Sequence, residues 1–422
     1  MDVLHPVSCG IDVHRDKLSV CILSTSDGKK TRKLLSSFST FPDDLLKLRS
    51  FLQEHNVSAV AMEATGIYWK PVYAALEGSC EQIVANAQHI KNVPGRKTDV
   101  IDSQWIAQLC SHGLLAPSFV PEKPIRELQQ LTRERTHLAQ RRATLINQLH
   151  RLLDQQGNKL GSVVSDLQGT SAKQILKMLA DGEQDTAKMA ECARTTLRKR
   201  KEELRRALAA PLSDVSRQQL KRALELWEIF DKQMAQIDQS LVEHCQPHQQ
   251  AIERLCEIPG VEVLTARKII AEIGVDMSAF ATPERLASWA GVCPGNNESA
   301  GKKKSGKTRA GNKYLKAVLM EAAMAAARSR GTYLKTKYHQ LKSRRGAKKA
   351  AMAIGHKILK IGWHLLSDPD ARYRELGEGY ADARREEQTV QRLVKRLEAL
   401  GREVSVQPRK PESEKEANGA EA

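Results

Sequence analysis

Short apolar runs alternate with helical patterns along the first part of the chain. Apolar runs of a few residues are typical of buried strands, and apolar positions three and four residues apart are typical of amphipathic helices. Three strands, a helix, a strand, a helix, a strand and a final helix are predicted in that order. Their ranges are 7–13, 18–25, 31–41, 42–56, 57–63, 67–78, 81–87 and 99–113. This order predicts an α/β domain, residues 1–121, with an RNase H-like (RuvC-like) fold.

Residues 122–255 have a different pattern, in which long charged stretches carry one apolar stripe. The first stretch covers 125–157, and the second covers about 197–255 and is interrupted near Pro211. Helices of this kind bridge domains or pair with another chain. We therefore predict an extended helical hairpin or coiled coil, which serves as a helical coiled-coil linker and dimerisation region. Because the heptads are imperfect, a compact helical domain is the alternative.

A third region, residues 256–368, has helical patterns joined by loops rich in Gly, Lys and Asn. Its segment 258–274, IPGVEVLTARKIIAEIG, has the pattern of a helix-hairpin-helix element, in which backbone N–H groups reach phosphates. Glu262 stands where a second glycine is usual, so packing and DNA contact both remain open. We predict a mainly helical domain here, followed by a charged tail, 369–422, whose end is disordered.

Composition narrows the class of partner. The chain has 67 Lys and Arg residues against 50 Asp and Glu, a net charge of +17, which favours a polyanionic partner such as nucleic acid. Hydrophobic residues make up 41%, which is enough to build cores. We find no apolar run that could span a membrane and no signal-peptide pattern. The eight cysteines lack C-x-x-C spacing, so we expect a cytoplasmic protein without that kind of zinc site.

Four acids of the first domain are candidate metal ligands. Asp12 interrupts an apolar strand, Glu63 ends another, and Asp99 and Asp102 lie three residues apart on one helical face. In an RNase H-like fold these positions converge, and crowded carboxylates repel one another unless cations neutralise them. Each acid alone also fits a turn or a helix cap. Together they predict a Mg²⁺ site of the kind that stabilises phosphoryl transfer.

A basic loop, NNESAGKKKSGKTRAGN, covers residues 296–312. Residues 301–350 contain sixteen Lys and Arg residues and one acid, so phosphate binding that weakens with salt is expected. Residues 301–308 also match the phosphate-binding loop of ATPases, but a polar segment with Pro294 replaces the buried strand which that motif must follow. We therefore predict nucleic-acid contacts. The contact residues are Lys302, Lys303, Lys304, Lys307, Arg309 and Lys313, with a second cluster at Arg344, Arg345, Lys348 and Lys349.

Two serines, Ser299 and Ser305, lie in this loop. A serine hydroxyl is a weak nucleophile unless its proton is taken up or its leaving group is stabilised. The neighbouring cations are suited to hold a scissile phosphate and to spread its charge. A loop serine is more often a turn residue, however, so the residues alone leave the nucleophile undecided.

Four segments together resemble the DEDD-type transposases of bacterial insertion sequences, the family numbered one-ten with its eleven-eleven branch. They are GIDVHRDKLSV, AMEATGIYW, GRKTDVIDSQWIAQL and GVCPGNNESAGKKKSGKTRAGNKYLK. The resemblance covers about residues 7–365 and implies a RuvC-like domain, a coiled coil and a carboxyl-terminal transposase domain. It also implies residue roles. The four acids would be Asp12, Glu63, Asp99 and Asp102, and the serine nucleophile would be Ser299, with Ser305 as the second choice.

The same resemblance implies a reaction and its partners. The chain would cut and rejoin double-stranded DNA, at element ends and target, through a Mg²⁺-assisted covalent serine–DNA intermediate. Acids of one subunit would meet the serine of another in a homodimer or homotetramer. Some members use an element-encoded non-coding RNA that pairs with both DNAs. Two other functions remain open from the residues alone: a metal-dependent nuclease like a Holliday-junction resolvase, and a non-catalytic nucleic-acid-binding protein.

Overall fold

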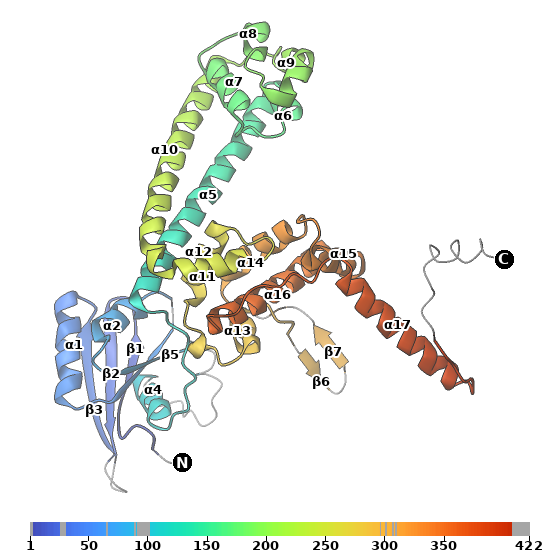
Figure 1. The fold of residues 1–422 in the computed structure, drawn as a ribbon. Helices are drawn as coiled ribbons and strands as arrows, with labels where there is room; N and C mark the ends of the chain where they lie inside the picture. The colour runs from blue at the N-terminus through green and yellow to red at the C-terminus, as the bar shows by residue number, and fades with distance from the viewer. Residues whose placement is uncertain are drawn as a thin grey trace. The chain divides into compact units, whose positions relative to one another are not determined.

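The computed structural model describes most of the chain, in two compact units, Met1–Val120 and Pro121–Ala422 (Figure 1). The described residues are 3–25, 31–64, 66–87, 90, 102–295, 297–299, 302–305, 308 and 310–406, with backbone alone for 297–299, 302–305 and 381–389. Asp99, Lys307, Arg309 and the chain end after residue 406, for which disorder is predicted, lie outside this set.

Within the described residues of the first unit, five strands form one mixed sheet in the order β3-β2-β1-β4-β5 (Figure 1). The first three strands pair antiparallel, whereas β4 is parallel to β1 and β5 is parallel to β4. The strands are β1 Val7–Val13, β2 Lys17–Ser24, β3 Arg32–Ser39, β4 Ala59–Glu63 and β5 Glu81–Ala85. The predicted RNase H-like arrangement is confirmed.

Helices cover the two faces of this sheet. Side chains alternate along a strand, so each face of the sheet has its own core. One face packs against α1 and α2, and the other packs against α4. The helices are α1 Pro42–Glu54, α2 Trp69–Leu76 and α4 Asp102–Ser111. On β1, Cys9 and Ile11 belong to the core that packs against α1 and α2. The alternate residues of this strand, such as Gly10, therefore face α4.

Gly10 allows α4 to approach β1 closely. A Cβ atom at this position would lie 2.2 Å from the Ser103 carbonyl oxygen and 2.3 Å from the Ala107 nitrogen. Ser8, on the same face of the strand, donates a hydrogen bond from Oγ to the Ala107 carbonyl at 3.2 Å. Ser8, Gly10 and Asp12 therefore form a stripe along α4, in the direction of its first residue.

The second unit contains an arm of two long helices, α5 Lys123–Gln155 and α10 Asp214–Cys245, which pack side by side (Figure 1). Arg135 pairs with Asp238, and Arg142 pairs with Asp231, so the two helices run antiparallel. This is an extended helical hairpin, one of the two arrangements that the pattern left open.

A small helical cluster, which we call the tip, joins the two long helices. Its apolar side chains share one core with the adjoining ends of α5 and α10, including Leu149 and Trp227. A compact helical domain was the alternative for residues 122–255, and within this region only the tip has that compact arrangement. Its elements are α6 Leu160–Val163, α7 Thr170–Ala180, α8 Thr186–Ala190, η1 Thr195–Arg200 and α9 Lys201–Ala207.

The rest of the second unit is helical apart from one small hairpin. The elements are η2 Gln246–His248, α11 Gln249–Cys256, α12 Val263–Ile273, η3 Met277–Ala279, α13 Pro283–Ala290, β6 Asn297–Ser299, β7 Lys302–Ser305, α14 Lys313–Ala326, α15 Tyr333–Arg345, α16 Ala347–Ser367 and α17 Tyr380–Glu398. The charged tail thus contains a helix, α17. No helix in the described part of the chain is long and apolar enough to cross a membrane.

The helix-hairpin-helix pattern forms the turn between α11 and α12. Gly260 has a φ of 87°, and a Cβ atom there would lie 2.4 Å from the Ala326 nitrogen and 2.5 Å from the Ala322 carbonyl oxygen on α14. A side chain would displace α14 from the turn. The sequence left packing and DNA contact open for this motif, and the structure shows that Gly260 has a packing role.

Candidate functional site

Three of the four predicted acids lie where β1, β4 and α4 come together. Asp12 lies on the α4-facing side of β1, and α4 begins at Asp102. Ile11 pairs with Met62 across the parallel strands, so Asp12 and Glu63 are neighbours one residue further along. Neighbours in adjacent strands point to the same face of a sheet. The fold therefore brings these three acids to one edge of the sheet.

Burial and nearby charges both change the pKa of Asp12. Its side chain is 22% exposed, and burial raises the pKa of its carboxyl group. His14 lowers this pKa through its charge and a hydrogen bond, whereas the charges of Asp102 and Glu63 raise it further. The net result is a pKa above the ordinary value for an aspartate. A cation at this position would relieve the repulsion among the acids.

His14 belongs to this site although the sequence pattern does not single it out. Its Nε2 lies 3.2 Å from Oδ2 of Asp12, and its side chain is 67% exposed. The spacing of two residues from Asp12 is the signal that points to it, because residues i and i+2 share one face of a strand. His14 therefore fits a role in holding the Asp12 carboxylate in position.

The donor set fits a hard divalent cation in its chemistry. Asp12, Glu63 and Asp102 supply carboxylate oxygens, which Mg²⁺ and similar ions prefer. Among the described residues, no group of three or more His, Cys, Asp or Glu is close enough to form a metal site by itself. The fourth predicted acid, Asp99, lies outside the described residues.

The two candidate serines lie on the hairpin of the second unit. β6 pairs antiparallel with β7, with Ser299 opposite Lys302 and Asn297 opposite Ser305. An isolated bridge between Pro294 and Thr308 lies at the base of this hairpin. An ATPase loop would open a helix at once, whereas α14 begins five residues after Thr308. The interpretation of this loop as an ATPase motif is therefore rejected by its backbone as well.

The hairpin leads into α14 through Asn312, which caps that helix. Its Oδ1 accepts hydrogen bonds from the backbone N–H groups of Tyr314 and Leu315 at 3.0 and 3.1 Å. Its Nδ2 donates to Oε2 of Glu272 on α12 at 2.5 Å. Glu272 is only 2% exposed. The chain that follows the serine hairpin is therefore tied to a buried carboxylate.

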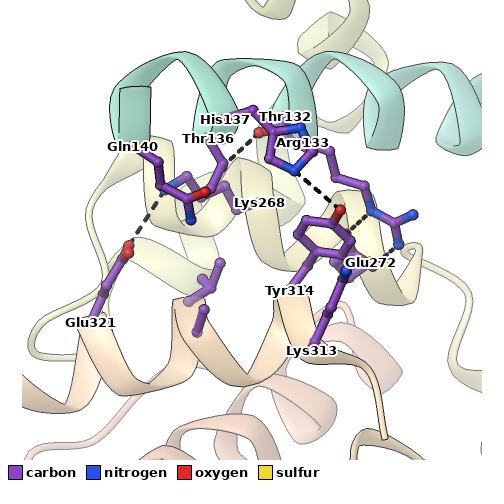
Figure 2. A pocket seen from close by; sticks show the side chains of 12 residues that line it. Thr132, Arg133, Thr136, His137, Gln140, Lys268, Glu272, Lys313, Tyr314 and Glu321 are labelled. Carbon is purple, nitrogen blue, oxygen red and sulfur yellow. Dashed lines mark hydrogen bonds and ion pairs between the residues drawn. The ribbon is translucent and has the colours of Figure 1, made fainter. Parts of the chain in front are cut away.

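The arm supplies the other partners of Glu272, and Figure 2 shows one of them, Arg133. Arg133 donates from Nε and Nη2 to the two carboxylate oxygens at 2.9 and 2.8 Å, and Gln129 donates at 3.1 Å. The Arg133 guanidinium also lies 4.3 Å from the centre of the Tyr314 ring. The Tyr314 hydroxyl lies 3.2 Å from Nε2 of His137. This bidentate, stacked arrangement fixes α5, α12 and the start of α14 together.

The same side chains border a hollow of about 220 Å³ between α5, α12 and α14 (Figure 2). Lys313, one of the predicted contact residues, lines it with its Nζ 5.1 Å from the centre of the Tyr314 ring. Lys268 pairs with Glu321 at 3.4 Å on the same hollow. Lys313 therefore lies beside the junction of arm and hairpin.

The other predicted contact residues of the loop have only their backbone described or lie outside the described residues. Lys302, Lys303 and Lys304 lie on β7, where the backbone alone is described, and Lys307 and Arg309 lie outside the described residues. The second predicted cluster is exposed at the corner between α15 and α16. No ion pair within 4.0 Å involves these cluster side chains in the described part of the chain. They are Arg344, Arg345, Lys348 and Lys349.

Two family models match the chain. Residues 9–157 match a family of DEDD type described as "Transposase", which is named for the element IS110. Residues 252–339 match a family described as "Transposase IS116/IS110/IS902 family". The first match contains all four predicted acids. The second contains the serine hairpin, together with Asn312, which follows it, and Glu272, to which Asn312 is hydrogen-bonded. Neither match includes the tip of the arm.

Individual relatives extend over most of the chain. A "Probable family 20 transposase" of Pseudomonas aeruginosa is 27% identical over 330 residues, which are 76% of this chain and 87% of the relative. The "Transposase for insertion sequence element IS1111A" of Coxiella burnetii is 28% identical over 320 residues, 74% and 78% of the two chains. An "uncharacterized 42 kDa protein" of insertion element IS900 of Mycobacterium paratuberculosis is 26% identical over 325 residues, 68% and 78%.

Proposed function

Because this chain belongs to the IS110/IS116/IS902 family of insertion-sequence transposases, we propose that it joins DNA through a covalent serine intermediate assisted by Mg²⁺. Transposases cleave and join DNA, so the chain is an enzyme and DNA is its substrate. The observation that carries the proposal is that Asp12 and Glu63 lie on adjacent parallel strands of the RNase H-like sheet, with the charges of Asp102 and Glu63 acting on Asp12. The non-catalytic alternative is set aside.

A divalent metal is implied by the DEDD family, and we propose Mg²⁺. Asp12, Glu63 and Asp102, joined by Asp99, would hold it. The carboxylates of Asp102 and Glu63, whose charges raise the pKa of Asp12, support this assignment. Bound Mg²⁺ would supply electrostatic stabilisation of the charge that develops on phosphate oxygens. His14 would hold the Asp12 carboxylate in one orientation by its contact at 3.2 Å.

Ser299 is the proposed nucleophile. Its Oγ would form a bond to a DNA phosphorus and lose its proton to a base, while the bond from phosphorus to the departing sugar oxygen breaks and that oxygen gains a proton. In the second step a sugar hydroxyl attacks the same phosphorus and releases the serine with its proton. One phosphodiester replaces another at each step, so rejoining needs no nucleotide triphosphate. Lys302 to Lys313 would hold the phosphate backbone.

Three finer proposals come from the family resemblance. Ser299 of one subunit would act with the acids of another in a homodimer or homotetramer, and the long arm supports such an arrangement. An element-encoded RNA would guide the reaction, which the exposed cations at the α15–α16 corner support. The regions 1–121, 122–255, 256–368 and 369–422 would act as nuclease domain, linker, transposase domain and tail.

The test is to express the chain beside its native flanking DNA, so that any element-encoded RNA is present. Protein that is covalently attached to DNA is then sought on a denaturing gel. Wild type is compared with Asp12→Ala, Ser299→Ala and, as a matched control, Ser305→Ala. We expect an adduct that depends on Mg²⁺, that is lost in the first two variants and that persists in the control.

Each other result has a definite meaning. An adduct that survives Ser299→Ala and disappears in Ser305→Ala would move the nucleophile to Ser305. Cleavage without an adduct in wild type would favour the metal-dependent nuclease, in which water takes the place of the serine. An adduct that forms equally in Asp12→Ala would remove the acids from the reaction.

A further inference from the structure

The tip of the arm carries a concentration of positive charge. Seven of the thirteen residues from 194 to 206, RTTLRKRKEELRR, are Lys or Arg, and two are Glu. Three of these cations have acidic partners within the tip: Arg200 with Glu203, Lys201 with Glu191 and Arg205 with Glu202. The other four cations are exposed and form no ion pair within 4.0 Å among the described residues. They are Arg194, Arg198, Lys199 and Arg206.

A hollow of about 520 Å³ lies beside these cations. Arg194, Arg200, Asp166 and the first turn of α7 are among the residues that line it. Gly169, the residue before α7, has no side chain to cap that helix, and the backbone N–H of Arg194 is bonded to Ser171 Oγ at 3.1 Å. The positive end of the helix adds to the charge of the arginines. Arg200 is paired with an acid of the tip, and Asp166 also lines the hollow, so the positive charge of this surface comes mainly from the four exposed cations.

The composition of the tip selects among nucleic-acid partners. Residues 157–213 contain no Phe, Tyr, Trp or His. Single strands and unpaired RNA bases are held mainly by stacking on aromatic rings, which this surface lacks. Cations without aromatic side chains suit the sugar–phosphate backbone of a duplex, which is bound without reading its sequence.

The length of the arm sets how far a bound duplex must extend to reach the tip. From Arg133, at the junction with α12 and α14, to the end of α5 at Gln155 is 22 residues, which span about 33 Å at 1.5 Å per residue. This distance corresponds to about ten base pairs of duplex DNA. A duplex held at the basic carboxyl-terminal region would therefore have to extend by about one helical turn to reach the tip.

We propose that the tip of the arm is a second binding surface for duplex DNA, which holds the backbone of the DNA flanking the site of strand exchange. The inference rests on DNA being the substrate and does not depend on which residue is the nucleophile. The tip would add affinity and orientation to flanking DNA, while the reaction takes place elsewhere. Neither family model includes this segment, so nothing in the comparisons assigns it a role.

The test measures equilibrium binding of the full chain to fluorescent duplexes of about 14 and about 40 base pairs, at several salt concentrations. The variant Arg198→Glu/Lys199→Glu reverses two exposed charges of the tip, and Arg198→Gln/Lys199→Gln removes them. A matched control, Arg141→Glu/Lys232→Glu, reverses two exposed charges on the shaft of the arm. Thermal unfolding checks that every variant is folded.

We expect wild type to bind the long duplex more tightly than the short one, and the charge-reversed tip to lose this difference. Binding of the long duplex should weaken about tenfold, and the slope of log Kd against log salt should fall by about two, because each phosphate contact contributes about 0.9. The glutamine variant should lose part of this affinity. Binding of the short duplex and binding by the shaft control should stay close to wild type.

Three results would overturn the inference. One is a wild-type affinity that is the same for both duplex lengths. Another is an equal loss in the tip and shaft variants, which would indicate an effect of overall charge. The third is a tip variant that binds both duplexes normally and loses affinity for a single-stranded RNA of about 40 nucleotides. Because the readout is binding, it is independent of whether an adduct forms on Ser299.

Discussion

Asp12 in the first unit and Glu272 in the second are both partly or fully withdrawn from solvent, and the described residues around them differ in charge. Burial raises the pKa of Asp12, His14 lowers it, and the charges of Asp102 and Glu63 raise it again. Glu272 is more deeply buried, yet Arg133, Gln129 and Asn312 all donate hydrogen bonds to it. A buried carboxylate without balancing charge is costly, whereas one with several donors stabilises its surroundings.

This difference distinguishes an acid at a functional site from an acid that stabilises the fold. Among the described residues, the carboxylates of Asp102 and Glu63 act on Asp12 from nearby, an arrangement that is typical of functional sites. Glu272 instead accepts hydrogen bonds from the arm and from the cap of α14. The depth of burial alone would rank Glu272 before Asp12 as a catalytic candidate, which is the reverse of the order that we propose.

The largest effect is expected from Asp12→Asn. Strand cleavage should fall by at least about a hundredfold, because the variant removes a carboxylate oxygen from the proposed metal site. The melting temperature should stay the same or rise, since one of several neighbouring like charges is lost. The measurements are cleavage of element-end DNA and thermal unfolding. Asp16→Asn, at an exposed acid nearby, is the control and should leave cleavage unchanged.

Glu272→Ala should show the opposite pattern, with a loss of folding stability of about 3 kcal/mol. It leaves the Arg133 guanidinium, which is 26% exposed, without its bidentate partner, and it leaves Asn312 without its acceptor. Chemical denaturation measures the loss. Glu321→Ala, at an exposed acid that lines the same hollow, should cost less than about 1 kcal/mol. Equal losses in both variants would contradict the structural role of Glu272.

Gly10→Ala should destabilise the first unit by about 1–3 kcal/mol and also reduce cleavage, because the new methyl group would force α4 away from β1. The approach of α4 to β1 brings Asp102 toward Asp12, so the two readouts should change together. Gly379→Ala, where a Cβ atom would meet no neighbour, is the control for loss of backbone freedom. Normal cleavage in a clearly destabilised Gly10→Ala protein would disconnect this glycine from the acids.

The smallest effect is expected at Asp231, an acid of the arm with surroundings between those of Asp12 and Glu272. Partial burial alone would raise its pKa, but hydrogen bonds and charge from Arg142 and Lys173 hold the pKa below its ordinary value. A lowered pKa in the folded state gives stability above about pH 4, which is lost as the pH falls through the folded value. Melting temperatures between pH 5 and pH 3 should therefore fall less steeply in Asp231→Asn than in wild type.

Much of the fold could be predicted because its signals are local. The alternation in VSCGIDV predicts β1 with its observed ends, and the one-sided stripe of α5 predicts a long helix. The proline near residue 211 predicts the break that separates α9 from α10. Each of these depends on side chains within one or two turns of one another, so no knowledge of distant partners was needed.

The candidate site could be predicted only in part. Asp12 stands out because it interrupts an apolar strand, and Glu63 because it ends another, and the order of elements then predicts that both lie near Asp102. His14 does not stand out, because a polar residue at a strand end is common. The packing role of Gly10 could not be predicted from the sequence either, since it depends on the backbone of a helix almost a hundred residues away.

The sequence by itself determined the identity of the strands and long helices, the excess of positive charge and the types of side chain available for chemistry. Only the tertiary structure decided which partners surround each acid, because the charge around a carboxylate depends on residues that are distant in the chain. Arg133 and Glu272 are separated by 139 residues, yet they form two hydrogen bonds. The free energy of a buried charge is set by its nearest partners in space, and the chain order does not contain them.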